Sequence, residues 1–288
     1  MSSSKVWLIT GCSSGFGNEL SKAALRRGDK VIATARNAAK LESLKAAGAS
    51  TLTLDITAGD EKLQKVIDEA VKTFGRIDIL VNNAAYGLQG AVEESSDEEV
   101  KAQFETNFFG QLTVIRAVLP HMRAQKSGVI ANFGSIAGWS GVAAGGIYSA
   151  TKFALVGITE FLRQENAHLG IECTIIEPGY FRTNLASSGS SVIAEKVIDD
   201  LRPVMDPIRE IFVAIDQNQP GDPAKGAQLV VEVLTKSGRC EGKPLPLRLP
   251  LGRDAVGICR GVLEQQTKSL NEWAELVSTT DLDDVVQS

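Results

Sequence analysis

The chain has 288 residues, of which 43% are hydrophobic and 23% are charged. This length and composition are typical of a soluble globular protein with one large core. The formal net charge of −5 argues against nucleic acid or a membrane surface as a partner, because both require an electropositive face. An anionic ligand would therefore need a local binding site.

The four cysteines indicate a reduced protein. Cys12, Cys173, Cys240 and Cys259 show neither close pairing nor metal-ligand spacing. The first residues lead directly into an apolar segment without the apolar core of a signal peptide. No apolar run reaches the length of about 18 residues that a spanning helix needs. These features predict a cytoplasmic location and no metal site.

Strand and helix patterns alternate along the first part of the chain. Strands are predicted at residues 5–10, 30–35, 50–54 and 77–81, and helices at residues 18–27, 39–47 and 60–74. Such a βαβαβ rhythm with short connections predicts a parallel sheet that is covered by helices on both faces.

The alternation continues to the end of the chain. Helices are predicted at residues 96–122, 147–169, 223–237 and 254–276, and strands at residues 129–133, 171–177 and 245–249. The predicted fold is α/β, a single Rossmann-type doubly wound parallel sheet of about seven strands in one domain, residues 1–288. The acidic tail, about residues 280–288, is expected to fray.

A glycine-rich turn lies between the first strand and the first helix. Gly11, Gly15 and Gly17 stand there, where the backbone can approach a pyrophosphate and the helix N-terminus supplies NH groups and positive potential. The spacing differs from the common G-x-G-x-x-G. A plain tight turn is the alternative, but three glycines so close together are costly without a ligand.

The end of the second strand bears on the choice of cofactor. It reads Ala35-Arg36-Asn37 and contains no acid. An acid near this position bonds the ribose hydroxyls of NAD, whereas an arginine accommodates the 2′-phosphate of NADP. Arg36 therefore points to NADP(H), with a solvated surface arginine as the alternative.

Other strands also end in polar or glycine-rich sequence, and the carboxyl ends of parallel strands share the edge where ligands bind. The residues that follow strands in this way are Asp55, Ile56, Asn82, Asn83, Ala84, Ser135, Pro178 and Gly179. Their convergence predicts a single binding cleft.

Tyr148 and Lys152 lie four residues apart on a predicted helix and therefore share a face. Moving a phenol pKa from about 10 to about 7 needs roughly 4 kcal/mol. A positive charge about 4 Å away supplies roughly that much at an effective dielectric of about 20. Lys152 would then make Tyr148 a proton donor and acceptor near neutral pH. The alternative is a half-exposed ring beside a solvated ammonium.

In order and spacing these motifs resemble the short-chain dehydrogenase/reductase family over about residues 5–185. The matching positions are Thr10-Gly11-x-x-x-Gly15-x-Gly17, Asn82-Asn83-Ala84, Asn107, Ser135, Tyr148-x-x-x-Lys152 and Pro178-Gly179. The segments from Pro178 to Asn184 and from Gln219 to Pro223 resemble its hydroxysteroid- and retinol-dehydrogenase-like branch. The resemblance implies an NADP-dependent ketoreductase that transfers hydride reversibly between NADPH and a carbonyl.

The resemblance also implies roles for individual residues. Tyr148 would be the general acid/base, Lys152 would bind the nicotinamide ribose, Ser135 the substrate oxygen, and Asn107 a water of the proton relay. The implied cofactor-binding residues are Gly11, Ser13, Ser14, Gly15, Phe16, Arg36, Asp55, Ile56, Asn82, Ala84, Tyr148, Lys152, Pro178, Gly179 and Thr183. Ala85 stands where the family more often has glycine, and alanine is tolerated there if the backbone is not left-handed.

A substrate lid is expected at about residues 185–217. It begins with a flexible Ser/Gly-rich composition, and residues 192–215 are predicted to be helical. Its apolar residues suggest a bulky, fairly apolar ketone, aldehyde or alcohol as substrate; they include Val192, Ile193, Ile211 and Phe212. The alternative is a helical excursion that merely packs on the core.

Two other functions remain open, an isomerase, cyclase or epimerase with this fold and a non-catalytic NADP-binding sensor. Retention of all four candidate catalytic residues favours redox chemistry. By resemblance, the protein is also expected to form a homodimer or homotetramer through the helices that contain Asn107 and Tyr148.

Overall fold

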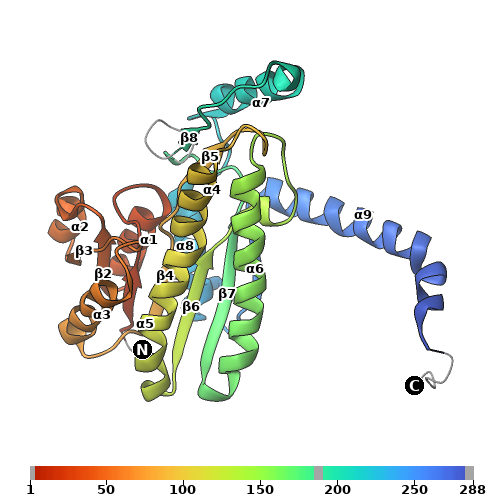
Figure 1. Ribbon diagram of the computed structural model, residues 1–288. Coiled ribbons are helices and arrows are strands. Elements are labelled where there is room, and N and C mark those ends of the chain that lie inside the picture. The colour runs from red at the N-terminus through yellow and green to blue at the C-terminus, as the bar shows by residue number, and fades with distance from the viewer. Residues whose placement is uncertain (1–3, 185–190, 283–288) are drawn as a thin grey trace.

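A seven-stranded parallel sheet forms the centre of the computed structural model, which describes residues 4–184 and 191–282 (Figure 1). Its strand order is β3-β2-β1-β4-β6-β7-β9, so the order reverses between β1 and β4. The strands are β1 (Val6–Ile9), β2 (Lys30–Ala35), β3 (Ser50–Thr53), β4 (Ile79–Asn82), β6 (Gly128–Phe133), β7 (Ile171–Pro178) and β9 (Arg248–Leu251). The predicted Rossmann-type sheet of about seven strands is confirmed.

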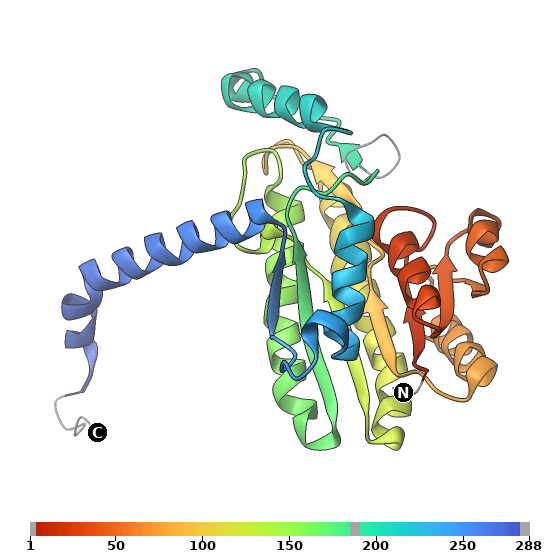
Figure 2. The ribbon, with the colours of Figure 1, turned by 180° about the vertical axis from the view of Figure 1, so that it is seen from behind.

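Helices cover both faces of this sheet. One face carries α1 (Gly15–Arg26), α2 (Glu42–Ala46) and α8 (Pro223–Thr235), and the other carries α3 (Asp60–Phe74), α5 (Gly110–Gln125) and α6 (Gly146–Asn166). Figures 1 and 2 show the two layers from opposite sides.

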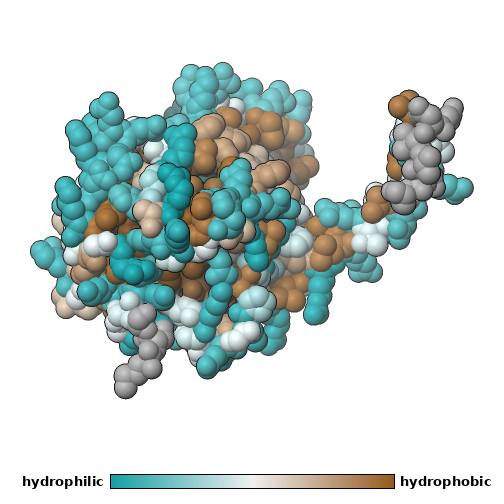
Figure 3. Space-filling view, turned by 90° about the horizontal axis from the view of Figure 1, so that it is seen from below, coloured by the Kyte–Doolittle hydropathy of each residue, from teal (hydrophilic) through white to brown (hydrophobic). Residues whose placement is uncertain are grey.

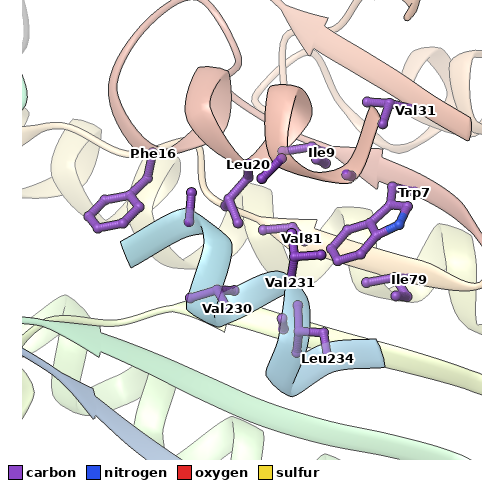
Figure 4. Packing of buried hydrophobic residues seen from close by; sticks show 14 of the residues in the cluster. Trp7, Ile9, Phe16, Leu20, Val31, Ile79, Val81, Val230, Val231 and Leu234 are labelled. Carbon is purple, nitrogen blue, oxygen red and sulfur yellow. The ribbon is translucent and has the colours of Figure 1, made fainter. Parts of the chain in front are cut away.

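The core consists of two apolar clusters, one on each face of the sheet. Strand β1 shows why, because Trp7 and Ile9 belong to one cluster and Val6 and Leu8 to the other. A strand that is buried on both faces needs this continuous apolar sequence. Figure 4 shows Leu20 of α1 and residues of α8 among the cluster that contains Trp7.

The helical region predicted at residues 96–122 is interrupted. It consists of α4 (Asp97–Phe104), a π-helical turn η2 (Glu105–Phe109) and α5. The turn adds a residue to the helix at Asn107, and such turns are frequent at functional sites. Residues 39–47 likewise divide into a 3-10 turn, η1 (Ala38–Leu41), and α2.

The helix predicted over residues 192–215 is wrong at its beginning. Ser191–Ile193 forms strand β8, which pairs in parallel with β5 (Gly87–Gln89) in a second small sheet. The β-branched Val192 and Ile193 favour a strand. The helix of this region is α7 (Arg202–Ile215), with Pro203 in its first turn, where proline is well tolerated. The preceding residues 185–190 of the predicted lid lie outside the described residues.

The last helix, α9 (Arg253–Val277), leaves the body of the molecule as an arm (Figures 1 and 2). Of its residues only Ala255 and Cys259 are buried. Figure 3 shows hydrophobic residues among hydrophilic ones along the arm. Across residues 4–184 and 191–282, no helix is long and apolar enough to cross a membrane.

Candidate active site

The candidate site lies at the carboxyl edge of the sheet, below β5, β8 and α7 in Figure 1. Gly11 and Gly15 have φ angles of 71° and 56°, which glycine adopts without strain. A Cβ on Gly17 would lie 2.5 Å from the Gly11 carbonyl oxygen. The glycines are therefore required by the close approach of the turn to the first helix.

Two residues that the sequence reasoning did not assign hold this turn in place. The Thr10 hydroxyl accepts hydrogen bonds from the backbone NH groups of Asn83 and Ala84, both at 3.0 Å. The Asn83 side-chain amide donates to the carbonyls of Thr10 (2.9 Å) and Gly11 (3.1 Å). Asn83, which directly follows β4, is the sequence signal that would have indicated this link.

The N-terminus of α1 is suited to an anion. Ser14 occupies the N-cap position but makes no side-chain capping bond, and Ser13 and Ser14 are exposed. The first NH groups of a helix need partners, and a phosphate can supply them. Phe16 contributes only its backbone, because its ring packs against Phe133 and Phe181 at centroid distances of 5.3 and 4.9 Å.

Arg36 is exposed at the end of β2. Hydrogen bonds to Asp55 from the backbone NH (3.0 Å) and the hydroxyl (2.8 Å) of Thr57 define the neighbouring loop. The Thr57 backbone bond and, more weakly, the Arg36 charge hold the pKa of Asp55 below its usual value. Ile56 is buried at the start of the same loop, with 6% of its surface exposed.

Asn82 lies inside the sheet, whereas the turn after β7 packs against the start of α9. The Asn82 side chain is fully buried and donates to Asn132 Oδ1 at 3.0 Å, so it joins two strands inside the sheet. Gly179 packs so closely on Asp254 that a Cβ would lie 2.3 Å from its carboxylate. Thr183 follows, and a Cβ on Gly15 would lie 3.5 Å from its side chain. The structure therefore brings Thr183 beside the glycine-rich turn.

Tyr148, Lys152 and Ser135 meet at the amino end of α6 as predicted. The Ser135 side chain lies close enough to the Tyr148 phenol to lower its pKa slightly. Lys152 is buried, donates from Nζ to the Phe133 carbonyl at 2.7 Å and lies 5.5 Å from the centroid of the Tyr148 ring. Loop, strand and helix thus supply one polar cluster.

The pKa values in this cluster differ from the sequence-based expectation. Burial raises the pKa of the Tyr148 phenol to about 12, against a smaller lowering by the Ser135 hydrogen bond. Burial also lowers the pKa of the Lys152 ammonium to about 7. The expected lowering of the Tyr148 pKa is therefore wrong for the protein alone, because the argument placed a full charge on Lys152 and neglected the desolvation of both groups.

Asn107 occupies the π-helical turn and is fully buried. Its side chain accepts from the Tyr86 backbone NH (3.1 Å) and donates to the Tyr86 carbonyl (2.8 Å) and the Thr151 hydroxyl (3.4 Å). Asn107 therefore connects the segment after β4 with α6, the helix of Tyr148.

Ala85 fits its position. The backbone at Ala85 is not left-handed, so alanine is tolerated there. Ala144, four residues before Tyr148, does have a positive φ of 65°. Its carbonyl accepts from Gly90 at 2.9 Å, which connects the segment before Tyr148 to the end of β5.

The fold and this cluster together define a dinucleotide-fold protein with a polar Tyr-Lys-Ser group at the ligand-binding edge. The family model described as "short chain dehydrogenase" matches residues 5–192. The chain therefore belongs to the short-chain dehydrogenase family, a family of oxidoreductases.

Individual relatives agree with this assignment. The chain is 37% identical over 276 residues to oxidoreductase BOA17 of Botryotinia fuckeliana, covering 94% of this chain and 97% of the relative. A short-chain dehydrogenase from Streptomyces avermitilis with a known crystal structure is 40% identical in sequence. The two structures superpose with a TM-score of 0.88, covering 97% of this chain and 100% of that chain.

Two more distant solved structures share the fold. A short-chain dehydrogenase/reductase from Burkholderia phymatum, in complex with NAD, is 24% identical with a TM-score of 0.75, covering 100% of this chain and 99% of that one. A tyrosine-to-phenylalanine variant of ElxO with NADPH bound is 25% identical in sequence with a TM-score of 0.68, covering 86% of this chain and 97% of that chain.

Proposed function

We propose that the protein is an NADP(H)-dependent oxidoreductase that interconverts a ketone or aldehyde with the corresponding alcohol on a bulky, fairly apolar substrate. The observation that carries this proposal is the cluster of Tyr148, Ser135 and Lys152 beside the glycine-rich turn. It combines a proton donor, a group that can hold an oxygen, and a titratable cation at the ligand-binding edge of the sheet.

The residues have separate tasks. Tyr148 donates its proton to the carbonyl oxygen during reduction and accepts it during oxidation. The hydroxyl of Ser135 holds that same oxygen, and Lys152 supports Tyr148 and binds the nicotinamide ribose. A bound nicotinamide dinucleotide supplies or accepts the hydride. The side chain of Asn107 is occupied within the protein, so the water of the proton relay falls to its backbone carbonyl.

The cofactor site is built from the glycine-rich turn, the free end of α1 and Arg36. Gly11, Ser13, Ser14 and Gly15 approach the pyrophosphate, because their turn is narrow and the helix end is uncapped. The exposed guanidinium of Arg36 pairs with the 2′-phosphate. Asp55, Ile56 and Ala84 border the adenosine and ribose, and Pro178, Gly179 and Thr183 border the nicotinamide.

The lid supports an apolar substrate. Val192 and Ile193 of β8 and Ile211 of α7 are between 47% and 59% exposed. Exposed apolar side chains of this kind suit the burial of an apolar ligand.

Three exposed phenylalanines support the proposal of a homodimer or homotetramer. Phe109 lies two residues after Asn107, and Phe153 and Phe161 lie on the Tyr148 helix, with 49%, 48% and 60% of their surfaces exposed. Such large apolar side chains on neighbouring helices are typical of interfaces between subunits.

Replacing Arg36 with Ala tests the cofactor proposal. Loss of charge-assisted hydrogen bonds worth about 1.5–3 kcal/mol should weaken NADPH binding about 10- to 100-fold and leave NADH binding unchanged. Fluorescence titration at fixed ionic strength measures both dissociation constants. Arg26→Ala, at an exposed site on the last turn of α1, is the matched control. A wild-type preference for NADH would contradict the proposal.

Replacing Tyr148 with Phe tests the chemistry. The ring stays and the proton donor is lost, so reduction of apolar ketones such as 2-tetralone by NADPH should fall by a factor of about 10² to 10⁴. NADPH binding, measured by fluorescence, should be retained. Turnover by the variant at the wild-type rate would exclude Tyr148 as the general acid.

A further inference from the structure

A buried ion pair lies behind the loop that carries Ser135. Glu177, near the end of β7, has no exposed surface, and Arg248 begins the neighbouring strand β9. Arg248 Nε donates to both carboxylate oxygens of Glu177, at 3.2 and 3.0 Å, and Nη2 donates to Oε1. Burial raises the pKa of Glu177, while the hydrogen bonds from Arg248 and Trp139 lower it.

The same pair holds the serine loop, residues 135–139, by three contacts. Arg248 Nη2 donates to the Gly138 carbonyl at 3.1 Å. The Trp139 indole NH donates to Glu177 Oε2 at 2.8 Å. The Arg248 guanidinium carbon lies 3.7 Å from the centroid of a Trp139 ring, within the range of a cation–π interaction. These contacts fix the distal end of the serine loop to the sheet.

Ser135 is bonded to that distal end. Gly138 donates from its backbone NH to the Ser135 carbonyl at 2.9 Å, and Ala137 donates to Ser135 Oγ at 3.1 Å. On the other side Gly138 packs against α6, where a Cβ would lie 3.3 Å from the Lys152 carbonyl oxygen. The serine loop is thus wedged between the ion pair and the helix of Tyr148 and Lys152.

The turn after β7 is held to β9 by a backbone hydrogen bond. Pro178 and Gly179 follow Glu177 directly, and Gly179 donates to the Leu251 carbonyl of β9 at 2.9 Å. The ion pair therefore lies directly before Pro178 and Gly179, which border the proposed nicotinamide position.

We propose that Glu177, Arg248 and Trp139 are positioning residues that set the place of Ser135 relative to Tyr148. This inference rests on the proposed function, because it concerns the serine of that site. A buried ion pair is by itself weak evidence of stabilisation, and well-packed apolar replacements are often neutral. Here Arg248 Nη2 also donates to the Gly138 carbonyl, and the Glu177 carboxylate accepts from Trp139. This arrangement favours a role in geometry.

A double-mutant cycle with Ser135→Ala tests the proposal. Because a displacement of about 1 Å can cost about 100-fold in rate, Arg248→Met should lower kcat for 2-tetralone by between about 10-fold and about 100-fold. In the Ser135→Ala background the same replacement should lower kcat by less than about threefold, since residues that act as a unit are strongly non-additive. The NADPH dissociation constant should change by less than about threefold in every variant.

Two further variants complete the experiment. Glu177→Gln combined with Arg248→Met removes the ion pair without leaving a buried charge, and should show the same coupling to Ser135 if Arg248→Met alone folds poorly. Arg239→Met removes the ion pair between Arg239 and Glu232, in which the arginine is exposed and lies outside the candidate site, and should leave kcat unchanged. Equal loss of kcat with and without Ser135 would overturn the proposal.

Amide hydrogen exchange separates this inference from the proposed function. Arg248→Met should raise exchange at Gly138 and Trp139 at least about tenfold, while the amides of β1 and β4 stay protected. Unchanged exchange at these two amides would overturn the positioning role whether or not the protein reduces 2-tetralone. If the wild type reduces no ketone but the exchange changes as expected, the proposed function fails and the link between the ion pair and the serine loop stands.

Discussion

At the scale of single residues, Lys152 is a buried side chain whose pKa is lowered. Only 2% of its surface is exposed, and burial lowers its pKa to about 7. The folded protein therefore binds this proton less tightly than the unfolded chain. Below about pH 7 the lysine is charged in both states and the cost of burying the charge is largest. That cost fades as the pH rises from about 7 toward the ordinary lysine value of about 10.4.

We expect Lys152→Met to raise thermal stability, and to do so more strongly at about pH 6 than at about pH 9.5. The difference between the two gains should reach about 3 kcal/mol, or about 6–12 °C in Tm. Lys243→Met, at an exposed site, should show no such difference. An equal gain in stability from Lys152→Met at both pH values would mean that the folded protein does not disfavour the charged lysine.

Tyr148 illustrates what spacing can and cannot predict. The interval of four residues was sufficient to place Tyr148 and Lys152 together, because helix geometry is local. The direction of the pKa shift was not predictable, because it depends on segments far away in the sequence that bury both groups. The motifs contain Thr10 and Asn83, but their role was not predicted for the same reason, since their hydrogen bonds join β1 to the segment after β4.

At the scale of elements, the long strands and helices could be predicted well from periodicity, and Asp60–Phe74 was predicted with its observed bounds. The strands of the described chain that were not predicted are β5 and β8, of three residues each. Strands so short carry too little pattern, and their pairing brings together segments about a hundred residues apart. The π-helical turn at Asn107 was also missed, because one inserted residue hardly disturbs a helical pattern.

The buried carboxylate of Glu94 links α7 and the segment before it to the body of the molecule. Glu94, 1% exposed, accepts from the Ile198 backbone NH (3.1 Å), Arg209 Nη2 (2.9 Å) and the Ala91 backbone NH (3.0 Å). Its pKa is lowered, most strongly by the Ala91 hydrogen bond. The segment before α7 and α7 itself therefore share one buried acceptor.

We expect Arg209→Met to loosen α7, because removal of one partner from a buried ion pair is far more costly than removal from an exposed one. Amide exchange over Arg202–Ile215 should rise at least about tenfold, with little change in the central sheet. Arg202→Met breaks an exposed ion pair to Asp199 in the same region and should have little effect. Comparable exchange in the two variants would show that Glu94 does not fasten the lid.

At the scale of the whole molecule, the body and the α9 arm differ in how they are stabilised. The body has two apolar clusters, whereas the arm exposes Leu263, Leu270, Trp273 and Leu276. An isolated helix gains most of its stability from packing of an apolar face. The arm therefore contributes little to the stability of a single chain.

We expect a chain that ends at Arg260 to unfold within about 2 °C of the full-length Tm at low micromolar concentration, because little buried surface is removed. Differential scanning calorimetry measures this difference. A control that ends at Arg253 removes the buried Ala255 and Cys259 as well and should be clearly less stable. A large loss of Tm on truncation at Arg260 would show that the arm is packed against something in solution.

The three tryptophans of the chain lie in three different parts of this architecture. Trp7 is buried in the core and donates to Asp29, Trp139 stacks on Arg248 beside the candidate site, and Trp273 is 58% exposed on the α9 arm. Intrinsic fluorescence therefore contains one reporter for the core, one for the serine loop and one for the arm. Three variants that each keep a single tryptophan would make unfolding, ligand binding and arm docking separately visible without any attached dye.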